Sequence, residues 1–502
     1  MALKMVLLGA AAMAARATAQ ISNLPAFLQK TSDVVFPELK GIAVDIFNHP
    51  ELGLQEYHAH DLIVDHFAGQ DGWVVTPSAH GLDTAFELVF EHRPEDYDGE
   101  LTTVGFLAEY DALIVGHACG HNHIALNSIT AATLAARALV EFDVPGRVKV
   151  VGCPDEENGA GKAKLHDAGA FDDAEVWMMA HPTASSAIQP MNARLNFFPR
   201  FSGDTHQEAV RKAYEAMVIV DDLALPGTAS SASTILNVGV YAVNVVQSQI
   251  SLGVAGVELA TVESTVDSIL DDTFPGVSYV AREDADGVAV NITGPGGHAS
   301  ESTRGALDLS IETFRALSDD SSVSFYLPDN TTFTELEITI DMRTRYTLDL
   351  PDMADTVSDA IGSLASSVTS DLKYPSLEVP RVIGQSFIDL LATPDYGLTD
   401  WDFSDFAPAS SDASWIQSAA VDPDTHEVLS MARLVFHPNY RICGTGEDDV
   451  CAFNHEPMFA EVAGSDYSYT QTEIIARAEA HTAIRLLSEE SFYNDVTAII
   501  RS

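Results

Sequence analysis

Short apolar runs alternate with segments of helical period in the first third of the chain. The runs at 104–108, 148–153 and 176–180 have the length and composition of strands that are buried on both faces of a parallel sheet. Residues 124–140, between the first two runs, are rich in alanine and repeat their apolar positions with the period of a helix. This alternation predicts an α/β fold in which helices connect the strands of a mixed, largely parallel sheet.

The pattern changes near residue 191. Residues 194–201, 288–292 and 335–341 alternate between apolar and polar side chains, which is typical of half-exposed antiparallel strands. The alternation of strands and helices then resumes in the last 120 or so residues. We therefore predict an α+β domain inserted into the α/β domain, with boundaries at 20–190 for the first α/β part, 191–380 for the insertion and 381–502 for the second α/β part.

The inserted region contains the same local sequence of features twice. A strand, a glycine, a histidine and a helix follow one another around His206, where the helix starts at Gln207, and again around His298, where it starts near Thr303. Such a repeat predicts two similar halves, 191–277 and 278–380. The alternative is one larger domain with a chance similarity.

The first residues predict a secretory signal peptide over 1–19. Lys4 precedes an apolar run at 5–15, and the small residues Ala17 and Ala19 lie just before Gln20. The run is too short to span a membrane, so a membrane anchor is the weaker alternative. We expect a secreted, extracellular protein.

Other features agree with secretion. Cys443 and Cys451 bracket a short polar loop that an extracellular disulfide could close, which leaves Cys119 and Cys153 unpaired. Asn291 and Asn330 each begin an Asn-X-Thr sequence that accepts glycans in secreted proteins.

Composition and charge exclude two classes of function. The chain has 502 residues, of which 46% are hydrophobic, enough to build more than one packed core. Its 74 acidic and 26 basic residues give a formal charge of -48, which repels phosphate backbones and anionic lipid headgroups. We therefore expect no nucleic-acid partner and no membrane partner.

Side chains that bind metals follow three successive strands of the predicted sheet. After the first strand comes the segment 108–113, with Glu109 and Asp111, and then four potential ligands, His117, Cys119, His121 and His123; the candidates after the second and third strands are Glu156, Glu157 and His181. Ligands of open α/β sheets gather at the carboxyl ends of the strands. Thiolate, imidazole and carboxylate together suit zinc or a similar transition ion better than calcium or magnesium. The sequence therefore predicts a metal site at this edge.

These motifs resemble a known family, the aminoacylase, glutamate carboxypeptidase and dipeptidase group of co-catalytic metallopeptidases, and most of all its amidohydrolase branch. The matching elements are His49-Pro50-Glu51-Leu52-Gly53 with Glu56, Cys119-Gly120-His121 and the pair Glu156-Glu157. The resemblance implies two zinc ions per chain, with manganese or cobalt as alternatives. It assigns Cys119 as the bridging ligand, His121, Glu157 and His181 as further ligands, and Glu156 as the general base.

The assignment of three histidine roles leaves more than one candidate residue. The resemblance implies a late histidine ligand, which we map to His455 with His437 as the rival, and His123 is an additional candidate ligand. It also implies that the inserted domain is a lid whose histidine stabilises the oxyanion. His298 fits that role best, and His206 is the competitor.

Arginines late in the inserted region are candidates for substrate binding. Arg343 or Arg345 could hold a substrate carboxylate bidentately, or could instead stabilise the lid fold.

The resulting functional hypothesis is a secreted metal-dependent amidohydrolase or peptidase acting on N-acyl amino acids or short peptides. Metal ions would activate a water, and Glu156 would take its proton and pass it to the leaving amine. The alternative is a non-catalytic metal-binding protein that retains the fold. A duplicated lid favours a monomer, because its halves could bury against one another, and a homodimer is the alternative.

Overall fold

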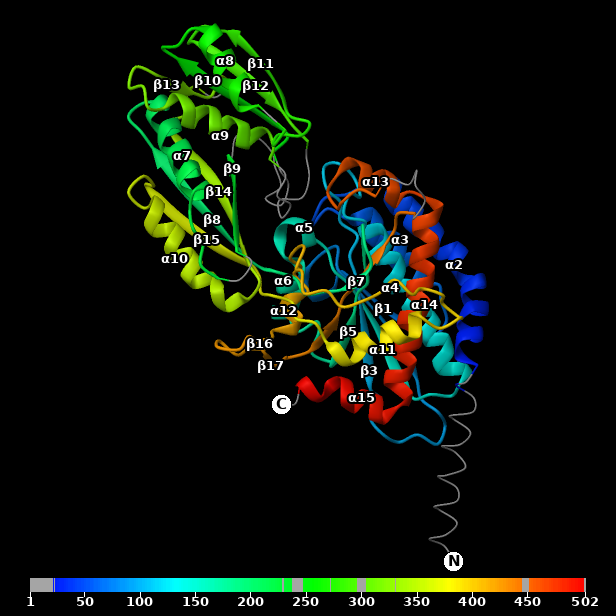
Figure 1. Cartoon of the computed structure of the whole chain (residues 1–502). Helices are drawn as coiled ribbons and strands as arrows, with labels where there is room; N and C mark the ends of the chain where they lie inside the picture. The colour runs from blue at the N-terminus through cyan, green and yellow to red at the C-terminus, as the bar shows by residue number, and fades with distance from the viewer. Residues whose placement is uncertain are drawn as a thin grey trace, which may run out of the picture.

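The computed structural model describes residues 21, 23–227, 230–236, 247–270, 272–295, 304–329, 331–444 and 451–500. The predicted signal peptide, His298 and Asn330 lie outside the described residues. Figure 1 shows two lobes: an α/β domain built from the first and last parts of the chain, and an inserted domain coloured green to yellow-green.

A six-stranded mixed sheet forms the centre of the α/β domain. Its strands lie in the order β1-β2-β4-β3-β5-β18. Their bounds are Trp73–Pro77 (β1), Phe86–His92 (β2), Thr103–Ala108 (β3), Gly146–Gly152 (β4), Val176–Met178 (β5) and Leu434–Phe436 (β18). Strands β4, β3, β5 and β18 run parallel, whereas β1 and β2 pair antiparallel at one edge. The three predicted parallel strands are thus confirmed, and β18 joins the last part of the chain to the same sheet.

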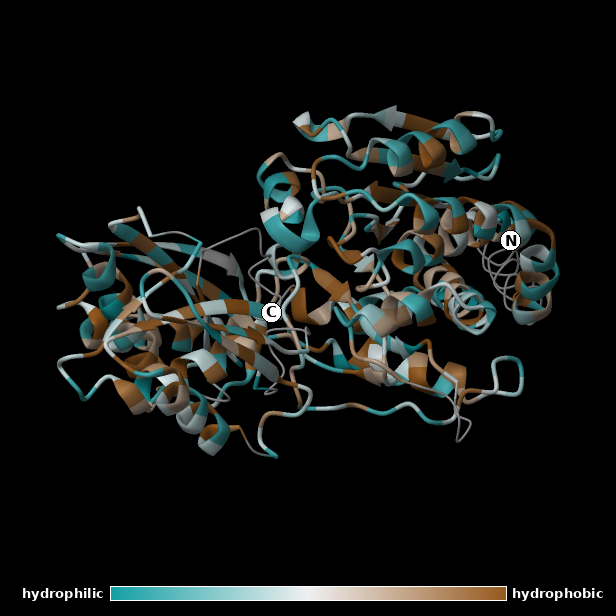
Figure 2. Ribbon diagram, turned by 90° about the horizontal axis from the view of Figure 1, so that it is seen from above, coloured by the Kyte–Doolittle hydropathy of each residue, from teal (hydrophilic) through white to brown (hydrophobic). Residues whose placement is uncertain are grey.

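Three long helices pack on one another, and α4 and α14 also pack on this sheet: α2 (Leu24–Asn48), α4 (His121–Glu141) and α14 (Asp466–Ser488). The helix predicted at 124–140 is α4, whose alanines allow α2, α14 and the sheet to approach it closely. Figure 2 shows hydrophobic residues along the strands and helices of this domain. Among the described residues, α4 alone is long and apolar enough to span a membrane, and 89% of its apolar window is buried.

Shorter elements complete the α/β domain. The helices are α3 (Tyr57–Ala68), η1 (Ala79–Gly81), α5 (Glu156–Gly159), α6 (Gly161–Asp167), α11 (Arg381–Leu391), α12 (Ser414–Gln417), α13 (Pro457–Ala463), α15 (Glu490–Thr497) and η3 (Ala498–Ile500). The additional strands are β6 (His181–Thr183), β7 (Ala187–Ile188) and β19 (Pro438–Arg441), which form one small sheet, and β16 (Ala420–Val421) and β17 (Val428–Ser430), which form another.

The inserted domain contains two four-stranded antiparallel sheets. One has the order β15-β8-β14-β9, from Ser367–Tyr374, Ala193–Ser202, Glu335–Thr344 and Ser231–Leu236, with helices α7 (His206–Asp221) and α10 (Leu350–Ile361) and the short η2 (Thr347–Asp349). The other has the order β11-β12-β10-β13, from Ser278–Glu283, Val288–Thr293, Gln249–Ala255 and Ser324–Tyr326, with helices α8 (Leu259–Ile269) and α9 (Ala306–Leu317).

Both sheets contain four strands, but the two units do not follow one another along the chain. They are nested, because the whole β10 to β13 unit lies in the chain between β9 and β14. The division expected between residues 277 and 278 therefore falls inside one sheet, between β10 and its partner β12. One apolar core joins the two units where α7 packs against α9, as in the contact between Tyr214 and Phe314, whose ring centroids are 5.2 Å apart.

Candidate active site

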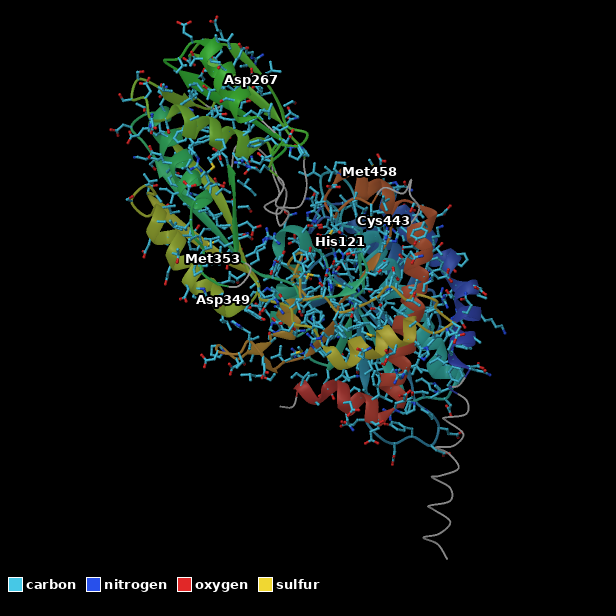
Figure 3. All side chains as sticks on the ribbon, viewed as in Figure 1. His121, Asp267, Asp349, Met353, Cys443 and Met458 are labelled. Carbon is cyan, nitrogen blue, oxygen red and sulfur yellow. A yellow bond between two sulfur atoms is a disulfide. The ribbon has the colours of Figure 1, made fainter. Side chains whose placement is uncertain are left out.

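The metal-binding side chains converge at the carboxyl edge of the central sheet. Glu109 and Asp111 follow β3, Glu156 and Glu157 open α5 after β4, and His181 follows β5. Gly120, with φ of +78°, makes the turn that places Cys119 before α4 and His121 on its first residue. His121 is labelled in Figure 3.

Two groups of three ligand atoms share the Cys119 thiol. One group contains Cys119, His121 and His181, and the other contains Cys119, Glu157 and His455. Within each group the ligand atoms lie no more than 4.8 Å from one another. A thiol common to two groups is the arrangement that a bridging ligand requires. The structure therefore brings together all five predicted ligands.

The spacing of these atoms fits ions of the size of zinc. With bonds of about 2.0–2.2 Å to nitrogen or oxygen and about 2.3 Å to sulfur, neighbouring ligand atoms of a tetrahedral ion lie about 3.4 Å (nitrogen and oxygen) or 3.6 Å (nitrogen and sulfur) apart. The His455 Nε2 to Glu157 Oε1 distance is 3.4 Å, and the Cys119 Sγ to His181 Nε2 distance is 3.6 Å. The donor set and its spacing thus suit a pair of transition ions.

Hydrogen bonds to groups outside the two ligand groups orient the candidate ligands. Asp111 Oδ1 bonds His121 Nδ1 at 2.8 Å, and Asp111 Oδ2 accepts the Glu157 backbone N–H at 3.0 Å. His181 Nδ1 donates to the Pro182 carbonyl at 2.9 Å, which leaves its Nε2 facing Cys119. Such outer bonds fix the tautomer and direction of metal-binding imidazoles.

Burial sets the protonation of the site. Burial, followed by the neighbouring His437, lowers the pKa of His181 to about 3, so this imidazole is neutral at pH 7 and can bind a metal. Burial, followed by the charge of Glu157, raises the pKa of the Cys119 thiol. A divalent ion reverses that effect, because its charge holds a coordinating thiol deprotonated. Burial and the charge of Glu109 raise the pKa of Glu156.

The two glutamates of the N-terminal motif, Glu51 and Glu56, form hydrogen bonds to the backbone near the candidate metal site. Both Glu51 carboxylate oxygens accept N–H groups of the first turn of α3, from His58 and Ala59, at 3.0 Å. Glu56 accepts the Asp155 N–H at 2.9 Å and the Thr84 hydroxyl at 2.8 Å. Because Asp155 has φ of +63° and precedes Glu156, we conclude that Glu56 stabilises the turn that presents the glutamate pair.

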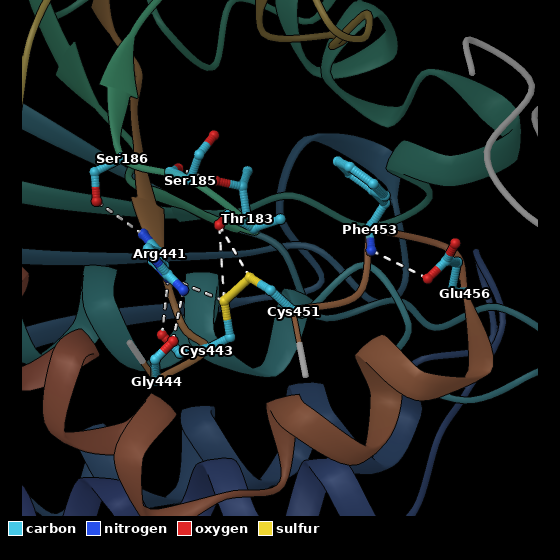
Figure 4. The surroundings of a disulfide bond; sticks show 10 residues. Thr183, Ser185, Ser186, Arg441, Cys443, Gly444, Cys451, Phe453 and Glu456 are labelled. Atoms are coloured by element: carbon cyan, nitrogen blue, oxygen red, sulfur yellow. Dashed lines mark hydrogen bonds between the residues drawn. A yellow bond between two sulfur atoms is a disulfide. The ribbon is translucent and has the colours of Figure 1, made fainter. Parts of the chain in front are cut away.

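His455 is placed by a loop that follows a disulfide. The predicted disulfide between Cys443 and Cys451 is present, and Figure 4 shows its surroundings. The Cys451 sulfur lies 3.1 Å from the carbonyl oxygen of Ala184, three residues after the candidate ligand His181. Farther along, the amide of Asn454 donates to the carbonyls of Cys119 and Pro182 at 3.2 and 3.0 Å. His455 itself has φ of +73°, a strained conformation for a residue other than glycine.

We expect removal of this disulfide to weaken metal binding as well as the fold. A Cys443→Ser/Cys451→Ser double variant loses the cross-link that restrains the segment leading to His455. Closing a loop of this size contributes about 2–3 kcal/mol to the free energy of unfolding. Thermal unfolding and metal analysis after dialysis measure the two effects. A variant with lower thermal stability but wild-type metal affinity would show that the disulfide does not position His455.

A cavity of about 160 Å³ opens above the metal ligands and is lined on one wall by Arg194 and Arg343. Both guanidinium groups are buried and flank Asp341: Arg194 Nε donates to its Oδ1 at 3.0 Å, and Arg343 Nη2 to its Oδ2 at 3.0 Å. Two positive charges against one negative charge leave this wall with a net positive charge. Arg345 does not line this cavity, because it forms a bidentate ion pair with Glu378 at 2.6 and 2.9 Å.

Sequence reasoning did not identify Arg194 as a site residue. The available signal was its strand, because β8 pairs antiparallel with β14 and places Arg194 directly opposite Arg343. That register depends on long-range pairing, which periodicity alone does not determine.

Three other candidate histidines take different positions. His206 is not at the cavity: its Nε2 accepts the Leu327 N–H at 2.9 Å and its Nδ1 donates to the Phe333 carbonyl at 2.6 Å, so both ring nitrogens bind the backbone of the inserted domain. His123 likewise binds Thr472 and the Ala463 carbonyl within the helical core, which corrects its reading as a candidate ligand. His437 lines the cavity beside His181 but belongs to neither ligand group.

Comparisons with known proteins agree with the motifs. No protein-family model matches the chain. The Xaa-Arg dipeptidase of Mus musculus is 40% identical over 162 residues, which are 31% of this chain and 37% of that protein. A p-aminobenzoyl-glutamate hydrolase chain of Escherichia coli (strain K12) is 28% identical over 169 residues, 29% of this chain and 33% of that one. The matched segments thus span about a third of each relative.

A solved structure extends the likeness to the whole fold. The crystal structure of an aminobenzoyl-glutamate utilization protein from Klebsiella pneumoniae superposes with a TM-score of 0.50, at 12% identity, and covers 91% of this chain and 98% of that one. The predicted peptidase-type fold is confirmed. The predicted resemblance to a family of dipeptidases and amidohydrolases is also confirmed.

Proposed function

We propose that the chain is a secreted metal-dependent amidohydrolase that hydrolyses the amide bond of N-acyl amino acids or short peptides. The observation that carries this proposal is the pair of ligand groups sharing Cys119, with Glu156 beside them on the wall of the same cavity. The names of the relatives, a dipeptidase and an aminobenzoyl-glutamate hydrolase, support an amide substrate. The N-terminal sequence and the disulfide support secretion.

The site residues have two proposed roles, metal binding and proton transfer. Cys119, His121, Glu157, His181 and His455 would hold two ions, for which zinc is our first choice. Ions bound there would polarise the amide carbonyl and lower the pKa of the attacking water. Glu156 lines the cavity next to the ligand Glu157, so its carboxylate can take the proton of the water and return it to the leaving amine. Burial and the charge of Glu109 raise the pKa of Glu156, which favours its uptake of a proton.

The cavity wall indicates which end of the substrate it binds. The net positive charge of Arg194, Arg343 and Asp341 suits the free carboxylate of an amino acid or peptide. Phe406 and Phe453 line the same cavity with exposed fractions of 70% and 56%, which favours an apolar acyl group or side chain at the open end. We further propose His298 as the donor to the oxyanion and a monomeric state, as inferred from the sequence.

Metal counting with and without chelator tests the function. We expect about two equivalents of zinc per chain, and hydrolysis of N-acyl amino acids or dipeptides that is lost on treatment with EDTA and restored by added zinc. A panel with apolar and charged acyl groups defines the substrate. Binding of no metal or one, together with no chelator-sensitive amidase activity on the panel, would instead support the non-catalytic metal-binding protein.

A further inference from the structure

Three side chains that can bind a metal also gather on the surface of the α/β domain. Asp45 lies in the last turn of α2, His49 follows that helix directly, and His58 lies in the first turn of α3. Their ligand atoms, one carboxylate oxygen and two imidazole nitrogens, lie no more than 4.8 Å from one another. None of the three side chains lines the cavity of the candidate active site. This surface cluster of Asp45, His49 and His58 is therefore separate from that site.

A single oxygen of Asp45 contacts both imidazoles of the surface cluster. Asp45 Oδ1 lies 2.7 Å from His49 Nδ1 and 2.9 Å from His58 Nε2, and the centroids of the two rings are 4.6 Å apart. Two atoms bonded at right angles to one ion, with bonds of about 2.0–2.1 Å, lie about 2.9 Å apart, as in octahedral and tetragonal sites. The distances from Asp45 Oδ1 are close to that separation, so little movement is needed to bind one ion.

The surroundings of the surface cluster favour a cation. The cluster lies at the C-terminal end of α2, where the helix dipole is negative, on a chain whose formal charge is -48. The side chains of His49, His58 and Asp45 are 61%, 41% and 42% exposed, so an ion can enter directly and keep water at its remaining positions. An ion here replaces the protons shared with Asp45, and each imidazole then carries its proton on the opposite ring nitrogen.

We propose that Asp45, His49 and His58 form a separate metal site on the surface, which binds one divalent transition ion. Two imidazoles and one carboxylate are ligands that nickel, copper and zinc accept, whereas calcium and magnesium prefer oxygen alone. Two histidines distinguish the cluster from a group of exposed carboxylates, which has no such preference for transition ions. This inference does not depend on the metal centre of the proposed function.

An ion at the surface site would join the end of α2 to the start of α3 across the loop 49–56. This loop contacts the candidate active site at two points. The Glu51 carbonyl accepts the Ala112 N–H at 2.7 Å, and the Glu56 carboxylate accepts the Asp155 N–H at 2.9 Å. The ion would therefore restrain the loop that supports the turn before Glu156, and its binding to the folded state should raise the Tm.

Calorimetric titration with nickel(II) tests the surface site. The full-length protein is first loaded with zinc and freed of excess metal, so that the candidate active site is filled. We expect it to bind one equivalent of nickel and to show a higher Tm. Loss of an outer partner of a metal ligand typically lowers affinity about 10- to 100-fold, so His49→Asn and His58→Asn, which each remove a direct ligand, should weaken this binding at least about tenfold. His92→Asn is the matched control, because His92 makes the same contact with Asp143 at 2.9 Å but belongs to no group of three ligands among the described residues.

The outcomes separate the surface site from the candidate active site. Loss of one nickel equivalent in both surface variants, with the zinc content and the His92→Asn titration unchanged, supports the inference. If His49→Asn and His58→Asn bind nickel as tightly as the wild type, or if the wild type binds none, the three side chains form only hydrogen bonds and the inference is overturned. Failure to load zinc would contradict the proposed function, and the comparison of variants would still test the surface site. In crystals soaked in nickel(II), an anomalous peak about 2.1 Å from both His49 Nδ1 and His58 Nε2 supports the site, and a peak at only one of them contradicts it.

Discussion

Replacing Glu156 by Gln should reduce kcat by about 10² to 10⁴ while both metal ions remain bound. The reason is that the proposed role of Glu156 is to receive and return a proton, which the Gln amide cannot do. Its neighbours Cys119 and Glu157 still hold the ions. KM should change little, because substrate binding depends on the cavity wall and the metal ions. Steady-state kinetics and metal analysis of the same preparation measure both quantities.

Glu157→Gln is the matched control, because it replaces the adjacent glutamate by the same residue. Glu157 lies 3.4 Å from His455 Nε2 and accounts for one of the three ligands in its group. Its replacement should lower the metal content together with the activity, and added zinc should restore part of both. If Glu156→Gln loses metal and Glu157→Gln keeps it, the two roles are exchanged. Full activity in both variants would place the reaction elsewhere.

The sequence predicted those strands in which the spacing of apolar residues follows from burial. The continuous apolar runs became β3, β4 and β5, because strands covered by helices on both faces have no polar side. The alternating segments became β8, β12 and β14, although the expected half-exposure fails for β14, in which all residues after Glu337 are buried. The nested order of the two sheets was not predictable, because β10 to β13 form a unit only through pairing across positions distant in the chain.

The residues of the two candidate ligand groups were predictable, but the roles of other polar residues were not. Cys119, His121, Glu157 and His181 follow strand ends or occur in a recognisable motif, so their types and positions carry the signal. His206 opens a helix after a glycine, as the expected lid histidine does, yet it binds backbone groups of Leu327 and Phe333. A short sequence cannot distinguish an imidazole that faces a cavity from one that satisfies a buried loop, because the packing of remote strands decides its direction.

Glu109 illustrates the same limit. It follows β3, and nothing in the sequence assigned it a particular role. In the structure it forms a buried ion pair with Lys162, which also pairs with Asp412, and these two residues lie 53 and 303 residues farther along the chain. Such a cluster exists only once the last part of the chain has joined the sheet through β18.

Replacing Arg194 by Met should lower kcat/KM for a substrate with a free carboxylate by about 30- to 5,000-fold, because removing one partner of a buried charged contact costs about 2–5 kcal/mol. The corresponding carboxamide should already be a poor substrate of the wild type, since it carries no charge to match the wall formed by Arg194 and Arg343. The variant should treat that amide much as the wild type does. The ratio of kcat/KM between acid and amide is therefore the informative quantity.

A matched control separates recognition from folding. Arg345 lies two residues after Arg343 on the same chain segment but pairs with Glu378 outside this cavity. Arg345→Met should leave the ratio of acid to amide unchanged, even if it lowers stability. Arg194→Lys should recover part of the ratio, because it restores the charge without the planar fork that binds a carboxylate bidentately. An unchanged ratio in Arg194→Met would mean that the carboxylate binds elsewhere and that the Arg194 contact to Asp341 only stabilises the inserted domain.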